Sequence, residues 1–543
     1  MQIAARRPAR PRPFSFSSAV AAIALVVASV AWPASAWTAV AESVSGVVFE
    51  DRNGSGRFEE GDRPLSGVGV SNGRQVVRTD AQGRYTLEVE GDAVLFVIKP
   101  RGYRTPLNED RLPQFFYVHR PEGSPEMQFA GMEPTGPLPA SVDFPLYPQE
   151  EPDDIRVVVF GDPQPRDEQE LDYIVRDVVE DLIRRRVAEE AAFGVSLGDI
   201  VFDDLRLFEP LNAAIARIGL PWYNVLGNHD CNFDAPHVDQ SFETFQRVYG
   251  PTYYAFDYGP AHFVVLNNIV WLEEDDRRYY RAGLGEAQRE FLGNSLALVP
   301  EDRLVVLLMH IPLVVSTPWV EGERDAFFRL IEDRPHTISF AAHTHTHEHH
   351  FLTAEDGWQG AEPHHHVIQA TICGSWWAGA PDEYGIPHAV MSDGTPNGYS
   401  VLTIRESDYQ VGYRVFRRPD DFQMHLHAPA SVAAEGADGA EVVANIFNAV
   451  PEAEVRMRVG EEGSWAAMER VERPDPVFLE LVERENRVAD RPWRNLPRPR
   501  NSMHLWAASL PAGLPPGTHT IEVRAANGDG QEFRGVRVIT VTP

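Results

Sequence analysis

The spacing of hydrophobic and polar positions changes along the 543-residue chain and divides it into regions of different expected structure. Residues 44–99 alternate apolar and polar side chains in short runs separated by Gly- and Asp-rich turns, which is typical of a small β-sandwich. Residues 155–416 instead combine short apolar runs with amphipathic helical periodicity, as in 156–160 followed by 168–190. Strands alternating with helices predict an α/β domain. After Pro419 the helical periodicity fades, and further short strands are expected.

These changes predict several domains, which a chain of this length can support. A Pro-rich stretch separates the first β-region from the α/β region and is interpreted as a linker. The expected boundaries are a signal peptide at 1–36, an N-terminal β-sandwich at 37–132, a linker at 133–154, the α/β domain at 155–418 and a β-rich C-terminal domain at 419–543.

The first residues have the pattern of an export signal. Four arginines between positions 6 and 12 precede an apolar run at 19–32, and Ala34-Ser35-Ala36 matches a cleavage site of small residues. The apolar run is short for a membrane span. We therefore predict a periplasmic or secreted protein with no membrane span after cleavage, with an uncleaved anchor as the alternative.

Charge narrows the expected partners. The chain has 80 acidic and 49 basic residues, a net charge of -31, and its one lysine is Lys99. A nucleic-acid or anionic-membrane surface needs clustered positive charge, so neither is expected. A small molecule is the expected partner, and the sequence leaves the oligomeric state open.

Five predicted strands in the α/β region end in side chains that can bind metal ions. Active sites of α/β domains form at the carboxyl ends of strands, and oxygen and imidazole ligands suit divalent cations. One such residue would be an ordinary turn cap or a structural histidine, whereas five strand ends together indicate a metal site. The residues are Asp162, Gln164, Asp199, Asn228, His310, His343 and His345.

In this order the motifs GD-x-[HQ], GD, GNHD, H and [GA]H-x-H resemble the calcineurin-like metallophosphoesterase family, over residues 155–416. The flanking regions resemble the β-domains of a bacterial subgroup of that family. The resemblance implies a four-layer α/β/β/α sandwich flanked by two small β-sandwich domains. It also implies an exported hydrolase of phosphate mono- or diesters. The alternative is a non-catalytic surface or ligand-binding protein with an inactive phosphoesterase-like domain.

The resemblance also implies roles for individual residues. Two divalent ions, Mn, Fe or Zn, would share an attacking hydroxide. His229 would protonate the leaving group, and Asp230 would orient its imidazole. One ion would be held by Asp162, Gln164 and His345, the other by Asn228, His310 and His343, and Asp199 would bridge the two.

Two positions depart from the common family pattern. Gln164 stands where many members have histidine, and Ala342 stands where many have glycine. Because an amide oxygen is a harder ligand than imidazole, Gln164 favours Mn²⁺ or Mg²⁺ over Zn²⁺ at the first ion.

Substrate contacts are predicted for Arg166, Trp376, Trp377, Asn397 and Tyr399, although the two tryptophans are equally compatible with the core. Six further histidines are expected to flank a loop and to be mostly solvated rather than to form a second metal site. They are His347, His349, His350, His364, His365 and His366.

Two features lie outside these motifs. A twelve-residue pattern in the N-terminal region matches a calcium loop, with a plain Asn-Gly turn as the alternative. Its expected ligands are Asp51, Asn53, Ser55, Arg57, Glu59 and Asp62. Cys231 and Cys373 both lie next to motif residues, and either a disulfide or two buried thiols is compatible with that spacing.

Overall fold

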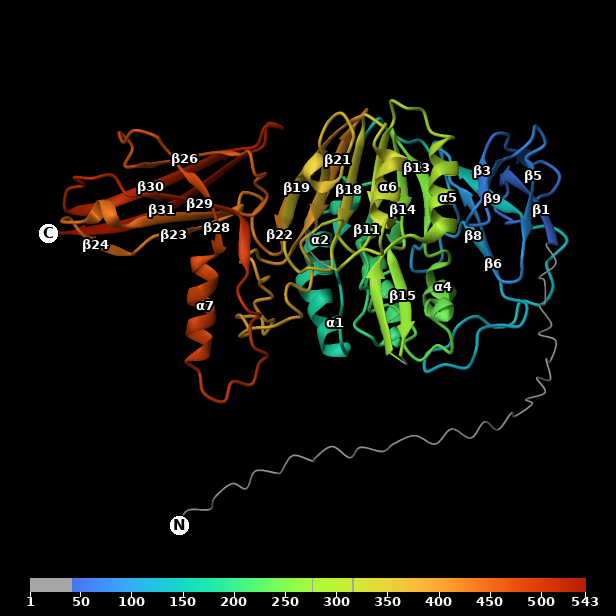
Figure 1. Cartoon of the computed structure of the whole chain (residues 1–543), viewed down its shortest axis with the longest axis horizontal. Helices are drawn as coiled ribbons and strands as arrows, with labels where there is room; N and C mark the ends of the chain where they lie inside the picture. Colours follow the sequence, from blue (N-terminus) through green and yellow to red (C-terminus); the bar gives the residue numbers. More distant parts are fainter. Residues whose placement is uncertain (1–41, 276, 315–316) are drawn as a thin grey trace, which may run out of the picture. The chain divides into compact units, whose positions relative to one another are not determined.

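The computed structural model describes residues 42–275, 277–314 and 317–543 (Figure 1). The predicted signal peptide lies outside these residues. Among the described residues, no helix is both long and apolar enough to cross a lipid bilayer.

The N-terminal region folds into two β-sheets, as the alternating pattern predicts. One sheet has the order β2-β1-β9-β7, with β5 also paired to β1, and the other has the order β4-β3-β6-β8. The alternating burial of β5 places Tyr85, Leu87 and Val89 in the core. The strands are β1 (Glu42–Glu50), β2 (Arg63–Pro64), β3 (Gly69–Ser71), β4 (Val76–Arg78), β5 (Arg84–Val89), β6 (Ala93–Ile98), β7 (Tyr103–Arg104), β8 (Phe116–His119) and β9 (Phe144–Pro148).

The predicted linker at 133–154 is partly structured. It contributes β9, which pairs in parallel with β1, and its last residue begins the first strand of the central domain. Just after β6, the buried Lys99 ammonium lies 2.6 Å from a carboxylate oxygen of Glu151 and 2.6 Å from the backbone carbonyl of Asp257. The N-terminal sheets are thus joined to the central domain through Lys99, which pairs with Glu151 of the linker and donates a hydrogen bond to Asp257.

The central domain contains two mixed sheets. The first has the order β12-β11-β10-β21-β22 and the second has the order β13-β14-β17-β18-β20-β19. The strands of the first are β10 (Asp154–Phe160), β11 (Phe193–Ser196), β12 (Trp222–Asn224), β21 (Gly398–Arg405) and β22 (Asp408–Val415). Those of the second are β13 (Tyr254–Tyr258), β14 (Ala261–Val265), β17 (Leu304–Leu308), β18 (Thr337–Ala341), β19 (Glu348–Leu352) and β20 (His364–Ile368).

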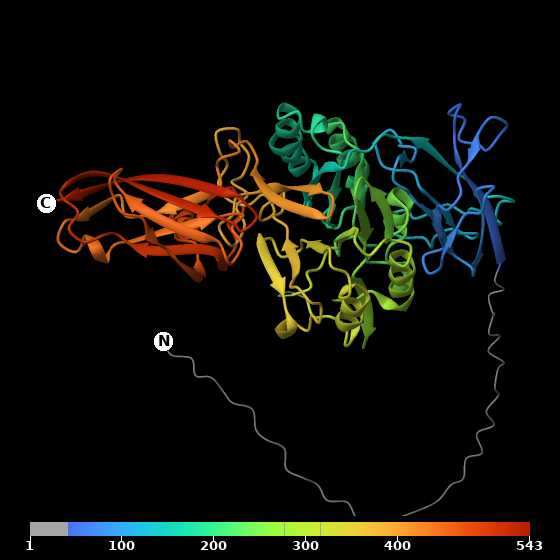
Figure 2. The same cartoon turned by 90° about the horizontal axis from the view of Figure 1, so that it is seen from above.

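Helices cover the outer face of each sheet, so the central domain is an α/β/β/α sandwich, as the resemblance implies. Figure 2 shows the teal helices on one side of the two sheets and the yellow-green helices on the other. The first group comprises α1 (Glu168–Ile174), α2 (Glu180–Arg184) and α3 (Phe208–Ile215), and α4 (Glu243–Tyr249) also packs there; the second comprises α5 (Gly285–Leu296) and α6 (Glu323–Ile331). The central domain also contains a small hairpin of β15 (Ile269–Glu274) and β16 (Arg277–Ala282).

The run of apolar residues in β10 is almost uninterrupted because both faces of the strand are buried. Val157 and Val159 belong to the core between the two sheets, whereas Val158 and Phe160 pack against the helices on the other face. Because successive side chains point to opposite faces, a strand buried on both sides is apolar at nearly every position.

The C-terminal domain consists of two further sheets with their own core. One has the order β23-β25-β29-β28, and the other β24-β31-β30-β26-β27. The strands are β23 (Met424–His427), β24 (Ser431–Ala433), β25 (Glu441–Ile446), β26 (Glu454–Val459), β27 (Ala466–Ala467), β28 (Glu469–Pro474), β29 (Asn501–Ser509), β30 (Gly517–Ala526) and β31 (Glu532–Thr542).

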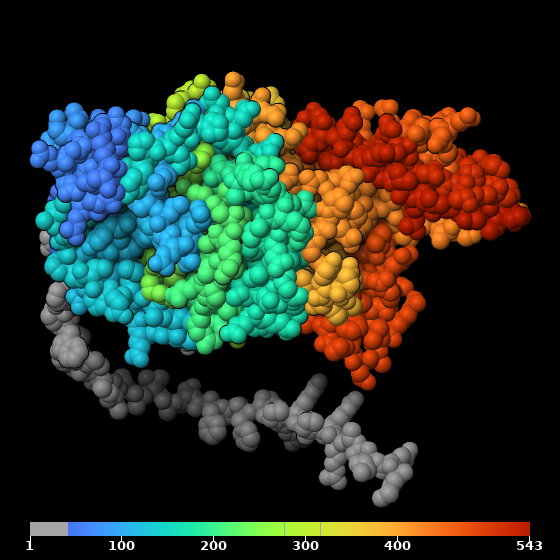
Figure 3. All heavy atoms as spheres, turned by 180° about the vertical axis from the view of Figure 1, so that it is seen from behind, coloured from blue at the N-terminus to red at the C-terminus, as the bar shows by residue number. Residues whose placement is uncertain are grey.

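The helix α7 (Pro476–Asn486) in this domain was not predicted. Asp475 caps its first turn by accepting a hydrogen bond from the Val477 N–H, and Pro476 occupies its start, where no donor is needed. In Figure 3 the light-orange segment near residue 380 lies between the teal helices and the orange-red surface of α7. Its contacts agree, since Arg176 donates to the Tyr384 carbonyl and Glu485 accepts from the Ala380 N–H.

Candidate metal centre

The five predicted strand ends come together where the two central sheets meet. Strands β10, β11 and β12 run parallel in the first sheet, and β17 and β18 run parallel in the second. Their carboxyl ends therefore carry their polar residues to one place. The Asp199 carboxylate and the His310 and His343 rings offer ligand atoms within 4.8 Å of one another.

Asp199 lies at the middle of this cluster. Its Oδ1 is 3.3 Å from His310 Nε2 and accepts a hydrogen bond of 2.9 Å from the His229 backbone N–H. Its Oδ2 accepts a hydrogen bond of 2.9 Å from Gln164 Nε2. His310 Nε2 lies 3.0 Å from Asn228 Oδ1. The Gln164 and Asn228 amides thus lie on different sides of one carboxylate.

His310 and His345 point their ring nitrogens in a way that suits a cation. His310 Nδ1 donates to the Leu197 carbonyl at 2.8 Å, and His345 Nδ1 donates to the Gly374 carbonyl at 2.5 Å. In a neutral ring whose Nδ1 carries the proton, Nε2 keeps a lone pair. Here that lone pair faces another acceptor, as in His345, whose Nε2 is 3.3 Å from Asp162 Oδ2. A ring fixed through Nδ1 by a backbone carbonyl is the usual arrangement of a metal-binding histidine.

The Gln164 side chain also indicates whether the residues present suit a metal ion. Its side-chain Oε1 is buried and has no hydrogen-bond partner among the described residues. A buried acceptor without a partner costs free energy, about 1–3 kcal/mol, so such an atom calls for an explanation. A cation held by this oxygen satisfies it, and the residues present therefore fit the metal ions that the fold implies.

The charges of the cluster also call for a cation. Burial, opposed in part by His310, raises the pKa of Asp162 to about 8, and the charge of Asp199 adds to the rise. Burial disfavours the His310 imidazolium, yet the nearby Asp199 carboxylate raises the pKa of His310 to about 9. The buried Asp162 carboxyl thus needs positive charge beside it to remain ionised at neutral pH.

Backbone strain is concentrated at this site. The left-handed region, which costs most residues about 1–3 kcal/mol, is occupied by five predicted ligands. Their φ values are 26° at Asp162, 45° at Gln164, 47° at Asp199, 70° at His343 and 53° at His345. Such strain persists only where surrounding contacts hold it, and it recurs at functional sites.

The glycines of the GD and GNHD motifs allow the loops to pack closely. A Cβ on Gly198 would lie 2.6 Å from His310 Nδ1, and a Cβ on Gly227 would lie 1.8 Å from the Asp199 nitrogen. Neither position has room for a side chain. The two glycines therefore bring Asp199 and His310 into contact.

His229 lies beside the cluster, but its partner differs from the prediction. Its Nδ1 is 2.6 Å from Asp203 Oδ1, and its ring stacks on Phe202 with centroids 4.3 Å apart. Burial lowers the pKa of His229, but the carboxylates of Asp199 and Asp203 outweigh it and raise the pKa above its ordinary value. His229 is thus held where it can carry a proton.

The predicted role of Asp230 is wrong. Its carboxylate accepts hydrogen bonds from the backbone N–H groups of Gly227, Ile200 and Val201, at 2.8 to 3.1 Å, so it ties two loops together. The acidic pair 203–204 follows the GD motif closely, and this sequence signal could have pointed to Asp203.

Two of the five predicted substrate residues lie at the site. The Trp376 ring is partly exposed and packs on His345 with centroids 4.2 Å apart. The Arg166 guanidinium is paired with Glu170, donates to the Trp376 carbonyl and lies 5.8 Å from the Phe202 ring. Arg166 and Trp376 therefore line the rim beside His345 and His229.

The other three predicted substrate residues are packed in the interior, which is a correction. Trp377 is 3% exposed and lies against Tyr173. Tyr399 is fully buried on β21 between aromatic rings, and Asn397 donates to a carboxylate oxygen of Asp177. Trp377 and Tyr399 thus present no surface to a substrate, and Asn397, 7% exposed, lines a cavity whose described lining includes none of the predicted metal ligands.

The additional histidines are also placed differently from the prediction. Instead of flanking a solvated loop, His349 and His350 lie on β19 and three others lie on β20, and all of the set except His350 are buried. Their partners are mostly neutral, such as Asn448 for His349 and Ser339 for His364. Regular strand structure and neutral partners make them part of the sheet.

The two cysteines are free, buried thiols in the structure. Cys231 Sγ lies 3.5 Å from the Gly227 carbonyl, and Cys373 Sγ lies 3.7 Å from the Gly374 carbonyl. The alternative of two buried thiols is therefore the one observed, and no disulfide joins them.

The predicted calcium loop turns several of its oxygens toward its own backbone. Asp51 accepts hydrogen bonds from the N–H groups of Gly54 and Gly56, and Asp62 accepts from those of Arg52 and Glu59. These bonds account for the loop without an ion. Calcium binding by this loop stays a prediction.

A cavity of about 950 Å³ opens elsewhere, between α2, the segment 382–397 and α7. Among the described residues, the lining of this cavity includes none of the seven predicted metal ligands. Arg417, which lines it, is already paired with Asp177 and Asp382. The candidate metal centre and this cavity are therefore separate features of the structure.

Comparison with known proteins agrees with this geometry. Residues 155–347 match the model for calcineurin-like phosphoesterases, residues 52–133 match the N-terminal domain model of such enzymes, and residues 366–533 match the C-terminal one. The chain belongs to the calcineurin-like phosphoesterase family, in the group that carries both extension domains.

No curated protein matches the chain. Among solved structures, a purple acid phosphatase from seeds of yellow lupin (Lupinus luteus) matches with 14% identity and a TM-score of 0.35. That match covers 69% of this chain and 67% of the other.

Proposed function

We propose that the protein hydrolyses phosphate mono- or diesters with the help of two divalent cations. The observation that carries the proposal is the orientation of the ligand atoms described above. His310 and His345 direct Nε2 toward oxygen acceptors, and Gln164 Oε1 is buried without a partner. Family membership independently supports a metal-dependent phosphoesterase.

In this proposal, each ion is held by residues of different strand ends. Bound divalent cations activate water as a nucleophile and neutralise charge on the phosphoryl group. Asp199, whose two oxygens face opposite sides of the cluster, belongs to both ions. Asp162, Gln164 and His345 would hold one ion, and Asn228, His310 and His343 the other.

His229 is the proposed proton donor to the leaving oxygen. Asp203 binds its Nδ1, so Nε2 is the ring atom left to face a substrate. The same contact favours the imidazolium form, which carries the proton that a leaving alkoxide needs. Arg166 and Trp376 are proposed to contact the substrate at the rim.

The test begins with full-length protein purified free of metal and then supplied with Mn²⁺. p-Nitrophenyl phosphate, its bis-ester, nucleotides and phospholipids are compared on one sample, with Asp199→Asn protein as the matched control. We expect two bound ions per chain and hydrolysis that depends on them. Bound metal with no turnover of any of the four substrates would favour a non-catalytic binding protein.

We also propose export, on the strength of the N-terminal sequence alone. Cell fractionation and N-terminal sequencing of the mature protein test it, with cleavage after Ala36 as the expected result. Retention of the full N-terminus in a membrane fraction would favour the uncleaved anchor.

A further inference from the structure

The backbone on the C-terminal side of His345 is held by a short turn that precedes β21. Ser392 Oγ donates to the His345 carbonyl at 3.4 Å, and Asp393 Oδ2 accepts a hydrogen bond of 2.9 Å from the His347 N–H. The two contacts bracket the residue between them, Thr346. They fix the chain directly after a predicted metal ligand.

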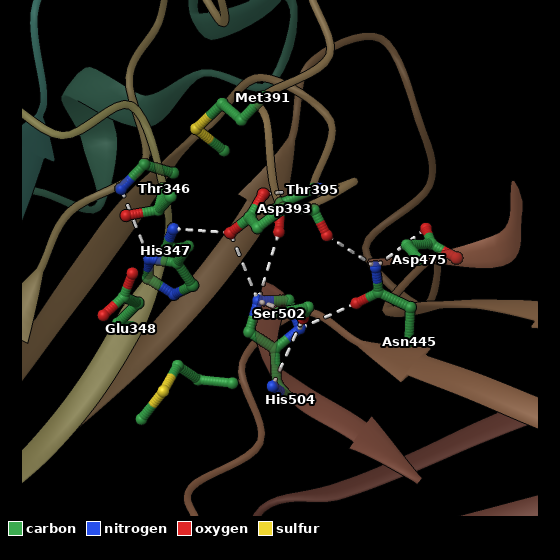
Figure 4. Close-up of polar contacts among 12 residues, drawn as sticks. Thr346, His347, Glu348, Met391, Asp393, Thr395, Asn445, Asp475, Ser502 and His504 are labelled. Carbon is green, nitrogen blue, oxygen red and sulfur yellow. Dashed lines mark hydrogen bonds and ion pairs between the residues drawn. The ribbon is translucent and has the colours of Figure 1, made fainter. Parts of the chain in front are cut away.

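Asp393 is buried and fully engaged. It is 1% exposed, and its Oδ1 accepts a hydrogen bond of 2.9 Å from the Thr395 N–H. Its Oδ2 also lies 3.4 Å from His504 Nε2. Figure 4 shows the Asp393 carboxylate between His347 on one side and His504 on the other.

His504 belongs to β29 of the C-terminal domain and is itself oriented by a neighbour. Its Nδ1 donates to Asn445 Oδ1 at 2.7 Å. Asn445 Nδ2 in turn donates to the Asp393 carbonyl at 3.3 Å and to Asp475 Oδ2 at 2.9 Å. The contacts thus run without a gap from the cap of α7 to the chain beside His345 (Figure 4).

The position of His345 depends on such support. Its backbone has a φ of 53°, in the left-handed region, and its Nε2 lies 3.3 Å from Asp162 Oδ2. If the chain after His345 relaxed toward an ordinary conformation, the ring would turn away from Asp162. Groups that orient a ligand from outside the ligand set commonly change metal affinity or activity about 10- to 100-fold when removed.

We propose that Asp393 is a positioning residue of the metal centre. Through His504 and Asn445, the C-terminal domain then helps to hold a ligand of that centre in place. The inference rests on the proposed function only in taking His345 as a metal ligand. It means that the C-terminal domain is not an independent module attached to the enzyme. The domain supplies the hydrogen bonds that keep one ligand in place.

The experiment is calorimetric titration of metal-free, full-length protein with Mn²⁺. Wild type should show two binding events. Asp393→Ala should weaken one of them about 10- to 100-fold and leave the other nearly unchanged, since only His345 is released. His504→Ala should weaken the same event by a smaller factor.

A double variant tests whether the two residues act through one path. Asp393→Ala/His504→Ala should bind no more weakly than Asp393→Ala alone, because His504 acts through Asp393. Asp393→Asn, which keeps an acceptor for the His347 N–H, should recover most of the lost affinity. Val523→Ala is the matched control, because Val523 lies in the core of the C-terminal domain and takes no part in the contacts that run from Asp475 to His347. It should lower the melting temperature and leave both binding events intact.

Three results would overturn the proposal. The first is wild-type affinity in Asp393→Ala. The second is equal weakening of both events in Asp393→Ala and Val523→Ala, which would indicate general loosening. The third is an additive effect in the double variant. Should Asp393→Ala fail to fold, unchanged affinity in His504→Ala would overturn it equally. A wild type that binds two Mn²⁺ but hydrolyses nothing would contradict the proposed function and leave this titration decisive.

Discussion

Two groups of buried histidines lie close together in the sequence and differ in what their rings face. In the metal centre, His310 and His345 turn Nε2 toward carboxylate and amide oxygens, and His345 has a left-handed backbone. On β19 and β20, His349 and His365 have regular strand conformations and pair with each other at 2.9 Å. Burial lowers the pKa of His365 to about 3, so its ring is neutral.

The comparison shows that histidine content and burial do not by themselves define a metal site. The β20 rings have hydroxyl, amide or imidazole partners that complete their hydrogen bonding, such as Ser339 for His364 and Tyr409 for His365. The metal-centre rings face the buried carboxylates of Asp199 and Asp162 and the amide oxygen of Asn228 instead. Partners, and not residue type, separate a ligand from a structural histidine.

The largest expected effect comes from the residue at the middle of the first group. Asp199→Asn removes the one carboxylate that we propose both ions share, so metal binding should fall at both sites and turnover should be abolished. Metal counting together with an assay on p-nitrophenyl phosphate measures this. A variant that keeps both ions would show that Asp199 does not bridge them.

His229→Ala should separate proton transfer from metal binding. We expect both ions to remain bound and the rate to fall about 10²- to 10⁴-fold, as for loss of a general acid. Measuring kcat and metal content on the same sample decides the point. Because Asp203 orients His229, Asp203→Asn should lower kcat about 10- to 100-fold in the same direction. A metal-free His229→Ala protein would contradict the assigned role.

Gln164→His should change metal preference rather than abolish binding. Imidazole binds Zn²⁺ better than a neutral amide oxygen does, so competition between Mn²⁺ and Zn²⁺ should move toward Zn²⁺ at one site. Activity need not rise, since a tighter ion can also hold product phosphate longer. Wild type and variant are compared side by side, and an unchanged preference would mean that Gln164 is not a ligand.

The smallest effect is expected in the second group of histidines. His365→Phe keeps the stack against Phe351 but leaves His349 Nδ1 without its partner, which should cost about 1–3 kcal/mol of stability. Thermal unfolding measures that loss. Metal content and turnover should stay at the wild-type level. Loss of a bound ion in this variant would remove the distinction between the two groups.

The strand ends of the metal centre could be predicted from sequence because each ligand follows its own strand within a few residues. Asp203 could not be assigned as the partner of His229, since Asp230 is closer along the chain and only the fold turns it toward backbone amides. The strand positions of the β20 histidines were missed for a similar reason. Their hydrogen-bond partners, such as Ser339 for His366 and Tyr409 for His365, are far away in sequence.

In the flanking domains, too, some features could be predicted from the sequence and others could not. Alternating patterns predicted β-domains at both ends, as observed. Helix α7 was missed although the Asp475-Pro476 pair is an ordinary helix start, because the surrounding residues follow strand patterns. Strand β9 was not predicted because its prolines are typical of a linker. Its pairing with β1 joins residues almost a hundred positions apart. Tyr399 was misassigned because an aromatic side chain at the end of a turn is compatible with either a substrate contact or the core.

The buried ion pair of Lys99 has a consequence for the chemistry of the whole chain. Lys99 is its only lysine, and its ammonium is enclosed by Glu151 and the Asp257 carbonyl. Reagents that acylate exposed amines therefore do not reach the side chain of Lys99 while this contact is closed. Acylation of Lys99 would then report that the contact between the N-terminal sheets and the central domain has opened.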